Sequence, residues 1–372
     1  MTIQCAVVTD PADLQALAPE WRALLADSES DEPTMSPEWL LTWWSVYGQL
    51  DSRELRVIVL RHNRALVGLA PLVFRRHWYR PGLPFRRLES MGSGERSGDG
   101  IISDYLGVVA RRGHEDAVAT ALVSALAAGS LGRWDELVVP LMDGDKSMPF
   151  RLSDAAGRAG LSANVEATTR APYIPLPPTW EGYLSALGKK GRYLIKRSLR
   201  DFEAWAAGEW SVVEATSSTL SDLKQILEAL HEERWDDNGG GVFRSRHFSA
   251  FHDQVMPLLL ERDALELLCL EVRGEPVAAM YNVRWANKTY FYQCGRSRDV
   301  PSQIRPGGVL LYLAVRRAIE SGQREFDFLG GEALYKKQLA LSSRPLVNLR
   351  IARRSIREHG RVSVRLARKA LV

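Results

Sequence analysis

The pattern of hydrophobic and polar residues in the first half of the chain predicts helices followed by strands. Residues 11–26 and 36–48 are predicted helices, and each begins with a capping side chain followed by a proline. After them, runs of apolar and β-branched residues predict strands. The other elements expected in this half are strands at 55–60 and 65–74, an irregular loop rich in Arg, Pro and Gly at 75–100, a strand at 103–109, a helix at 114–128 and a strand at 134–139.

The second half of the chain repeats this order. An amphipathic helix is predicted at 219–235, where leucines recur on one side. The elements expected after it are a helix at 246–262, a meander of strands at 265–273, 277–285 and 289–294, a helix at 309–320 and a strand at 325–329. The repetition indicates a mixed α/β (α+β) fold of two tandem domains, each a mostly antiparallel twisted sheet flanked by helices.

The proline-rich run at 172–178 suggests where the two domains join. We therefore expect one domain at 1–171, a second at 172–349 and a basic amphipathic tail at 350–372. The arginines of this tail suit contact with acidic lipid or RNA, or a helix docked on the protein.

Composition excludes several classes of protein. The chain has 372 residues, is 45% hydrophobic and carries a net charge of +4, which is typical of a globular protein and too small for a general nucleic-acid binder. No apolar run is long enough for a membrane helix, and the first residues lack the features of a secretory signal. The spacing of the cysteines and histidines suggests neither disulfides nor a metal site, so a cytoplasmic protein without a metal is expected.

Residues 301–338 contain the most informative motif. Gly307 and Gly308 open a predicted helix, and the N–H groups at the start of a helix are free to bind an anion, usually a phosphate. Arg305, just before them, would add a charged contact, and Val309 continues the same turn. The alternative is a plain turn between a strand and a helix.

Acid–base groups follow this helix. Asp327 lies on a predicted strand, where alternation places it opposite Phe326 and Phe328, so its carboxylate is suited to deprotonate an acceptor amine. It would otherwise pair with an arginine or cap a turn. His231, near the end of the helix at 219–235, is a second candidate base because an ordinary histidine titrates near neutral pH.

Further polar and aromatic residues suggest where a substrate binds. Lys189, Arg192, Lys196 and Arg200 form a basic stripe if they lie on a helix, suited to a phosphorylated ligand or tRNA unless it is simply a solvated face. The other candidates are Arg234 and Trp235, which precede a glycine-rich loop at 236–241 expected to cover a substrate, and the strand residues Tyr292 and Gln293.

Several motifs in this order resemble those of acyltransferases. GKKGRYLIKRSLR, HEERW, YFYQCGRSRD, PGGVLLYLAVRRAIESG and EFDFLGGEALYKK together look like the GNAT acetyltransferases called CelD-like or BioF-linked, which are relatives of the FemABX peptidyltransferases. The resemblance covers most of residues 180–340. It implies a tandem GNAT-like fold, a proton-donating phenol at Tyr335, and a lysine near the substrate at Lys336 first and Lys337 second. The usual acetyltransferase phosphate signature fits residues 303–308 only loosely.

The resemblance implies an acyl-CoA donor, either acetyl-CoA or a longer acyl-CoA. The acyl group would pass directly to an amine or hydroxyl of a small molecule or of a cell-envelope or polysaccharide precursor, without a covalent enzyme intermediate. Two alternatives stay open: an aminoacyl-tRNA donor, as in the FemABX relatives, and a non-catalytic scaffold in envelope or polysaccharide assembly.

Overall fold

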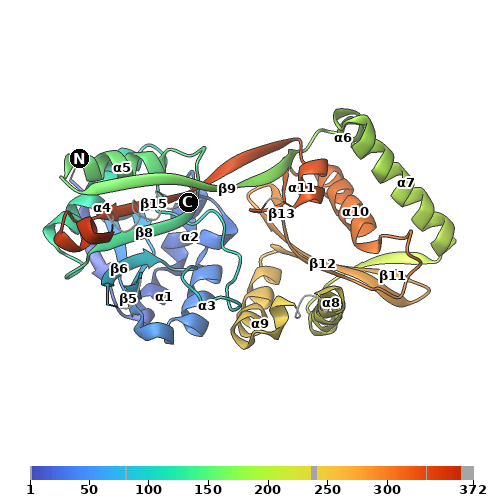
Figure 1. The fold of residues 1–372 in the computed structure, drawn as a ribbon, viewed down its shortest axis with the longest axis horizontal. Coiled ribbons are helices and arrows are strands. Elements are labelled where there is room, and N and C mark those ends of the chain that lie inside the picture. Colours follow the sequence, from blue (N-terminus) through green and yellow to red (C-terminus); the bar gives the residue numbers. More distant parts are fainter. Residues whose placement is uncertain (1, 80–81, 236–240, 332, 362–372) are drawn as a thin grey trace. The chain divides into compact units, whose positions relative to one another are not determined.

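The computed structural model describes residues 2–79, 82–235, 241–331 and 333–361, which form two compact units (Figure 1). The first unit comprises Met1–Glu95, Ser103–Thr168 and Pro345–Val372, and the second comprises Arg96–Ile102 and Thr169–Arg344. The chain therefore enters the second unit twice and then returns to the first.

The first unit combines helices with two sets of paired strands. Its helices are α1 (Pro11–Ala16), α2 (Ala18–Ala26), η1 (Pro33–Met35), α3 (Pro37–Tyr47), η2 (Leu50–Ser52), α4 (Glu115–Ala128) and α5 (Met148–Arg158). Its strands are β1 (Gln4–Val8), β2 (Glu54–Leu55), β3 (Val57–His62), β4 (Ala65–Ala70), β5 (Leu72–Trp78), β6 (Pro84–Ser90), β7 (Val109–Ala110) and β8 (Glu136–Asp143). One set has the order β1-β3-β4-β7, and the other pairs β8 with β6 and β6 with β5.

Two strands run from one unit into the other. They are β9 (Ser162–Pro175) and β15 (Ser342–Ala352). In the first unit β15 pairs antiparallel with β8, and its Leu346, Leu349 and Ile351 are fully buried. The core of this unit joins Leu349 and Ile351 to the apolar faces of α4 and α5, so residues far apart in sequence complete one core.

The second unit holds the longer strand meander. Its helices are α6 (Trp180–Ala186), α7 (Lys189–Ala206), α8 (Leu220–Trp235), η4 (Val242–Arg244), α9 (Arg246–Leu260), α10 (Pro306–Glu320) and α11 (Leu334–Leu339). Its remaining strands are β10 (Trp210–Glu214), β11 (Leu265–Val272), β12 (Glu275–Trp285), β13 (Lys288–Arg296) and β14 (Glu325–Asp327). The strand order is β10-β11-β12-β13-β14-β9.

Helices cover both faces of this second sheet. Figure 1 shows α7 and α10 on one face of β11–β12, and α8 and α9 on the other. The sheet is antiparallel except where β14 runs parallel to β13. This mixed α/β architecture is the predicted fold class, with helices packed on mostly antiparallel sheets in both units.

Two predicted segments in the first half are wrong in detail. The expected loop at 75–100 contains the end of β5 and all of β6. The many arginines of these strands made the segment look irregular in the sequence, but in the structure they pair with acidic side chains, as Arg75 does with Glu89. The expected strand at 103–109 is irregular apart from its last residue. There Tyr105 has a positive φ of 66° and donates its backbone N–H to Leu141, so the backbone turns although it is buried.

The pattern at the expected boundary and tail also differs from the prediction. Pro172 and Pro175 lie within β9 and not in a connection, and residues 350–352 complete β15. Residues 356–361 are helical, and residues 362–372 of the expected tail lie outside the described residues. The sequence also gave no indication of β1, α5, β10 or α11.

Candidate functional site

The candidate site forms where β13 and β14 part. These strands pair over only three positions, from Lys288↔Glu325 to Tyr290↔Asp327. Beyond them β13 continues to Arg296, whereas the chain after β14 turns through Leu329, which has a positive φ of 58°. The separation leaves room beside the second half of β13, and α11 and the start of α10 line this space.

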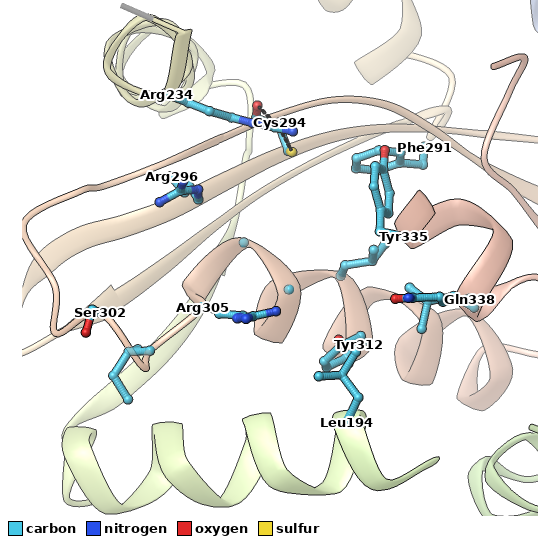
Figure 2. Close-up of a pocket in the computed structure, with 15 residues that line it drawn as sticks. Leu194, Arg234, Phe291, Cys294, Arg296, Ser302, Arg305, Tyr312, Tyr335 and Gln338 are labelled. Atoms are coloured by element: carbon cyan, nitrogen blue, oxygen red, sulfur yellow. Dashed lines mark hydrogen bonds between the residues drawn. The ribbon is translucent and has the colours of Figure 1, made fainter. Parts of the chain in front are cut away.

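The first cavity lies between β13, α11 and the N-terminus of α10 and has a volume of about 430 Å³. Figure 2 shows its charged and aromatic side chains, with Arg296 on the strand and Arg305 before the helix. It is lined by Leu194, Arg234, Phe291, Cys294, Arg296, Ser302, Ile304, Arg305, Gly307, Gly308, Leu311, Tyr312, Tyr335, Gln338 and Leu339.

The start of α10 presents free N–H groups to this cavity. Pro306 has no N–H, and Val309 already donates to the carbonyl of Arg305, which leaves Gly307 and Gly308 without an intrahelical acceptor. Arg305, at the cap position, provides no side-chain capping bond. Two free N–H groups and two exposed arginines, Arg296 and Arg305, therefore make this end of the cavity suited to an anion.

The protein's own packing does not require glycine at these two positions. A Cβ on Gly307 would meet only the Arg296 side chain at 3.6 Å, and one on Gly308 would meet Tyr312 at 3.7 Å, which are ordinary contacts. Neither glycine has a positive φ. Glycine at these positions therefore does not relieve backbone strain. Its lack of a side chain leaves the N–H groups accessible to a bound group.

The second cavity lies on the other side of Tyr335 and has a volume of about 300 Å³. It collects most of the predicted substrate residues, which come from α8, β13 and α11. It is lined by Ile102, His231, Arg234, Trp235, Gly241, Val242, Phe291, Tyr292, Gln293, Cys294, Phe328, Leu329, Gly330, Tyr335 and Lys336.

Four side chains line both cavities and form the wall between them: Arg234, Phe291, Cys294 and Tyr335. Arg234 Nη1 donates to Cys294 Sγ at 2.8 Å (Figure 2), and its guanidinium also lies 5.1 Å from the ring of Trp235. The Tyr335 ring packs edge-on against Phe291 at 6.3 Å between centroids. Burial raises the pKa of the Tyr335 phenol above its ordinary value, and the nearby Cys294 raises it further, so the phenol stays protonated at neutral pH.

A glycine brings α8 close enough to contribute to this wall. A Cβ on Gly295 would lie 2.4 Å from the backbone nitrogen of His231 and 2.5 Å from the carbonyl carbon of Leu230. Only glycine allows the backbones of α8 and β13 to approach so closely. This contact places His231 and Arg234 beside the cavities.

His231 is buried and neutral rather than poised as a base. Burial lowers its pKa to about 4, with the Arg234 charge as the second cause, and the Gln293 side chain hydrogen-bonds to the ring. Its Nδ1 is buried and has no hydrogen-bond partner among the described residues. An imidazole with so low a pKa is a weak acceptor of protons.

Asp327 and Val309 lie away from both cavities. Asp327 is fully buried, its carboxylate accepts the Leu329 N–H at 2.6 Å, and Arg344 lies 3.9 Å from its other oxygen. This is the capping and pairing arrangement that the sequence left as its alternative role. The side chain of Val309 is buried in the core of the second unit and lines neither cavity.

Among the predicted lysines and the residues of the basic stripe, only Lys336 lines one of the two cavities. Lys336 lines the second cavity and donates to the carbonyl of Gly330 at 2.8 Å, while Lys337 lines a separate depression. Arg192 turns back to the carbonyls at the end of α6, with Nε 2.9 Å from Leu184 O. Lys189 is exposed at the start of α7, and Arg200 pairs with Asp201. The stripe is therefore mostly a solvated and self-paired face.

Some lining residues were missed from sequence. Arg296, Cys294 and Phe291 follow one another at alternate or near-alternate positions on β13, beside the predicted Tyr292 and Gln293. Their signal was the run FYQCGR, in which aromatic and charged residues interrupt an apolar strand. Of the glycine-rich loop at 236–241 expected to cover the site, residues 236–240 lie outside the described residues, and Gly241 lines the second cavity.

Neither a metal site nor a membrane-spanning helix is found among the described residues. There, no group of three or more His, Cys, Asp or Glu side chains is arranged to hold a metal ion. No helix in that part of the chain is long and apolar enough to cross a membrane.

Comparisons with known proteins agree with this architecture. Residues 189–337 match the acetyltransferase (GNAT) domain family. No curated protein sequence is significantly similar to the chain. Among solved structures, FemX is 12% identical, covers 92% of this chain and 96% of its own, and has a TM-score of 0.59.

Two other structures share the fold. L-PGS from Bacillus licheniformis is 13% identical, with coverage of 96% of this chain and 97% of its own and a TM-score of 0.51. A conserved protein of unknown function from Bacteroides thetaiotaomicron is 11% identical and has a TM-score of 0.55. The match covers 95% of this chain and 100% of that protein's chain. The matched domain contains both cavities apart from a few lining residues at their edges. The chain is therefore an acyltransferase that carries a GNAT-superfamily domain on a fold shared with FemX.

Proposed function

We propose that the enzyme transfers an acyl group from acyl-CoA in the first cavity to an amine or hydroxyl in the second. The observation that supports this most directly is the shared wall: one cavity ends at the open N-terminus of α10, and both meet at Tyr335. A donor and an acceptor bound on the two sides would have their reacting atoms at the same wall.

The donor's phosphates would bind at the start of α10. Gly307 and Gly308 would donate their N–H groups, and Arg296 and Arg305 would supply positive charge. The pantetheine arm would then run between the apolar side chains of Leu311, Ile304 and Leu339. This direction brings the thioester to the wall formed by Phe291, Cys294 and Tyr335.

The transfer itself is a direct displacement. The acceptor's nitrogen or oxygen attacks the thioester carbonyl, a bond from that atom to the acyl carbon forms, and the carbon–sulfur bond breaks. The Tyr335 phenol gives its proton to the departing thiolate. Because Tyr335 lines both cavities, the tyrosinate can take back the proton that the acceptor loses, and the cycle closes without a covalent enzyme intermediate.

In this proposal Tyr335 carries the proton transfer that the sequence had suggested for Asp327. Asp327 instead holds the turn after β14, and His231, with its pKa near 4, helps to shape the second cavity. Lys336, Trp235 and Gln293 would contact the acceptor, which we take to be a small molecule or an envelope or polysaccharide precursor in the cytoplasm.

An aminoacyl-tRNA donor is the second candidate. The observation that favours it is that Arg296 and Arg305 are exposed beside the first cavity, where their N–H groups could donate to a phosphate of a large ligand such as tRNA. The open cavity beside Gly307 and Gly308 argues against a scaffold without turnover, since such a protein has no need of a space at this helix end.

Thermal unfolding with acetyl-CoA, longer acyl-CoAs, free CoA and tRNA distinguishes these donors. A ligand at a hundred times its Kd stabilises the folded state by about 2.7 kcal/mol. We expect the melting temperature to rise with CoA and its esters. A rise with aminoacylated tRNA alone would replace the acyl-CoA proposal with the second candidate, and no rise with any donor would contradict both.

A further inference from the structure

Arg234 carries a charge that no acidic side chain balances among the described residues. Its guanidinium donates there to Cys294 alone, from Nη1 to the sulfur at 2.8 Å and to the carbonyl at 3.4 Å. The adjacent acids, Glu232 and Glu233, bind other side chains. Because Arg234 is half-buried, a charge without a counterion costs free energy at this place. Its position therefore indicates that negative charge is present there during function.

The guanidinium is held at the wall between the two cavities. Arg234 lines both of them, and Figure 2 shows its side chain reaching from α8 toward Cys294. The Trp235 ring lies 5.1 Å from the guanidinium, and the close contact of Gly295 with the backbone of α8 fixes where the helix lies. The charge thus lies where the acyl group would pass from one cavity to the other.

Arg234 already favours negative charge on a sulfur. Burial raises the pKa of the Cys294 thiol, whereas the charge of Arg234 and its hydrogen bond lower this pKa. A cation beside a thiol is a usual means by which proteins stabilise a thiolate. Nη2 and Nε of Arg234 have no acceptor among the described residues, so the same guanidinium has donors for a second sulfur that reaches the wall.

We propose that Arg234 binds the sulfur of coenzyme A and stabilises its thiolate during acyl transfer. When the carbon–sulfur bond breaks, its electron pair goes to the sulfur. The guanidinium then donates hydrogen bonds to this thiolate until the Tyr335 phenol protonates it. The inference rests on the proposal that acyl-CoA is the donor in the first cavity. Since Arg234 lines that cavity and already contacts a sulfur, the donor's sulfur is a better-supported partner than an acid group of the acceptor.

Several titratable groups surround this place and would also respond to pH. They come from each element at the two cavities: His231 on α8, Tyr292, Cys294 and Arg296 on β13, Tyr335 and Lys336 on α11, and Arg305 and Tyr312 at α10. A ligand that differs from coenzyme A only at the sulfur meets the same groups, so their titration affects both ligands alike. A comparison of the two ligands therefore isolates the contribution of the thiol.

Calorimetric titration with coenzyme A and with desulfo-coenzyme A, in which a hydrogen atom replaces the thiol, tests the proposal. A free thiol loses its proton at about pH 8.5, and a bound state that favours the thiolate lowers this pKa. The affinity for coenzyme A relative to desulfo-coenzyme A should therefore rise with pH. If the bound pKa is lower by about one unit, the ratio rises roughly eight-fold between about pH 6.5 and about pH 9.5.

Arg234→Gln should abolish this rise and leave the affinity for desulfo-coenzyme A nearly unchanged, which would show that the cavity is intact. Arg234→Lys keeps the charge and should keep part of the rise. Arg296→Gln is the matched control, because Arg296 lines only the first cavity, where it would contact the donor's phosphates. It should weaken the binding of both ligands and preserve the rise with pH.

The outcomes separate this inference from the proposed function. A ratio that does not change with pH, an equal rise in the Arg234→Gln variant, or an equal loss of both ligands in that variant would overturn the role of Arg234 while coenzyme A still binds to the unsubstituted protein. Absence of binding of both ligands to the unsubstituted protein would overturn the proposed function, and this inference with it.

Discussion

Tyr335 is the side chain of the cavity wall that is best suited to move a proton. Its phenol lies beside Phe291 and Cys294, and burial raises its pKa above the ordinary value. The raised pKa makes the phenol a weaker acid, which in water would make it a poor proton donor. Burial also raises the proton affinity of the thiolate that forms beside it, so the proton transfer can still be favourable. The role therefore depends on the position of Tyr335 as much as on its chemistry.

Tyr335→Phe removes this proton while keeping the ring. We expect kcat for acyl transfer to fall about a hundred-fold or more, which is the usual contribution of a general acid. The affinity for CoA should change little, because the phenyl ring still closes the wall. Steady-state kinetics and titration of CoA measure the two effects separately. Equal activity of the variant would exclude Tyr335 as the proton donor.

His231 makes folding sensitive to acid. Its pKa is about 4 in the folded protein and about 6.5 when unfolded, so the unfolded chain binds more protons between these values. The part of the unfolding free energy that depends on neutral His231 should be fully present above about pH 6.5 and should be lost as the pH drops toward about 4. His231→Gln should reduce this slope in denaturant titrations at several pH values. An unchanged slope would show that other groups, such as His77 and His252, account for it.

At the scale of elements, the site depends on where one strand pair ends and one helix begins. β14 stops at Asp327 while β13 continues to Arg296, and α10 starts with Pro306 and two glycines. The sequence predicted α10, β13 and the glycines, because each has a local signal in a cap, an alternation or a turn. It could not predict that the two strands part, since strand pairing depends on residues distant in sequence.

The same limit explains which elements were missed. The strand β6 carries Arg86 and Arg87, whose acidic partners Asp135 and Glu136 lie about fifty residues later, and the pattern alone cannot reveal the pairs. Asp327 was suggested as a base because alternation placed it opposite the phenylalanines. Its use as the cap of the following turn depends on backbone geometry that the pattern does not contain.

Gly308→Ala should separate stability from function in α10. Alanine in place of glycine within a helix stabilises it by about 0.5–1 kcal/mol, and the structure has room for the added Cβ. The same methyl group lies beside the N–H groups that would hold the donor's phosphates. We therefore expect a higher melting temperature together with weaker CoA binding.

Gly157→Ala is the control for this prediction. Gly157 lies within α5, and an added Cβ there would meet nothing within 4 Å. It should stabilise the protein by a similar amount and leave CoA binding unchanged. If Gly308→Ala binds CoA as well as the Gly157 control does, the start of α10 is not the phosphate site.

At the scale of the whole molecule, the chain completes its first unit only after passing through the second. Leu349 lies on β15, is fully buried and belongs to the core that also contains residues of α4 and α5. The sequence predicted two tandem domains as consecutive segments. It gave no sign of this return, because nothing local marks residues 345–352 as a strand of the earlier unit.

Leu349→Ala should show that the returning strand holds the first unit together. Removal of a fully buried leucine side chain costs about 2–5 kcal/mol of unfolding free energy. Ile356→Ala, at a position that is 92% exposed, should change it by less than about 0.5 kcal/mol. Hydrogen exchange should rise in β8 and β15 of the Leu349 variant. A loss of protection confined to the second unit would contradict this assignment of β15.

Calorimetric titration of CoA tests the central claim most directly, since it measures donor binding without an acceptor. For the unsubstituted protein we expect one site, and for Gly308→Val, whose larger side chain would cover the free N–H groups, an affinity at least ten-fold lower. The Gly157→Ala control should bind as the unsubstituted protein does. Absence of CoA binding, or equal affinity of the Gly308→Val variant, would contradict a donor site at the start of α10.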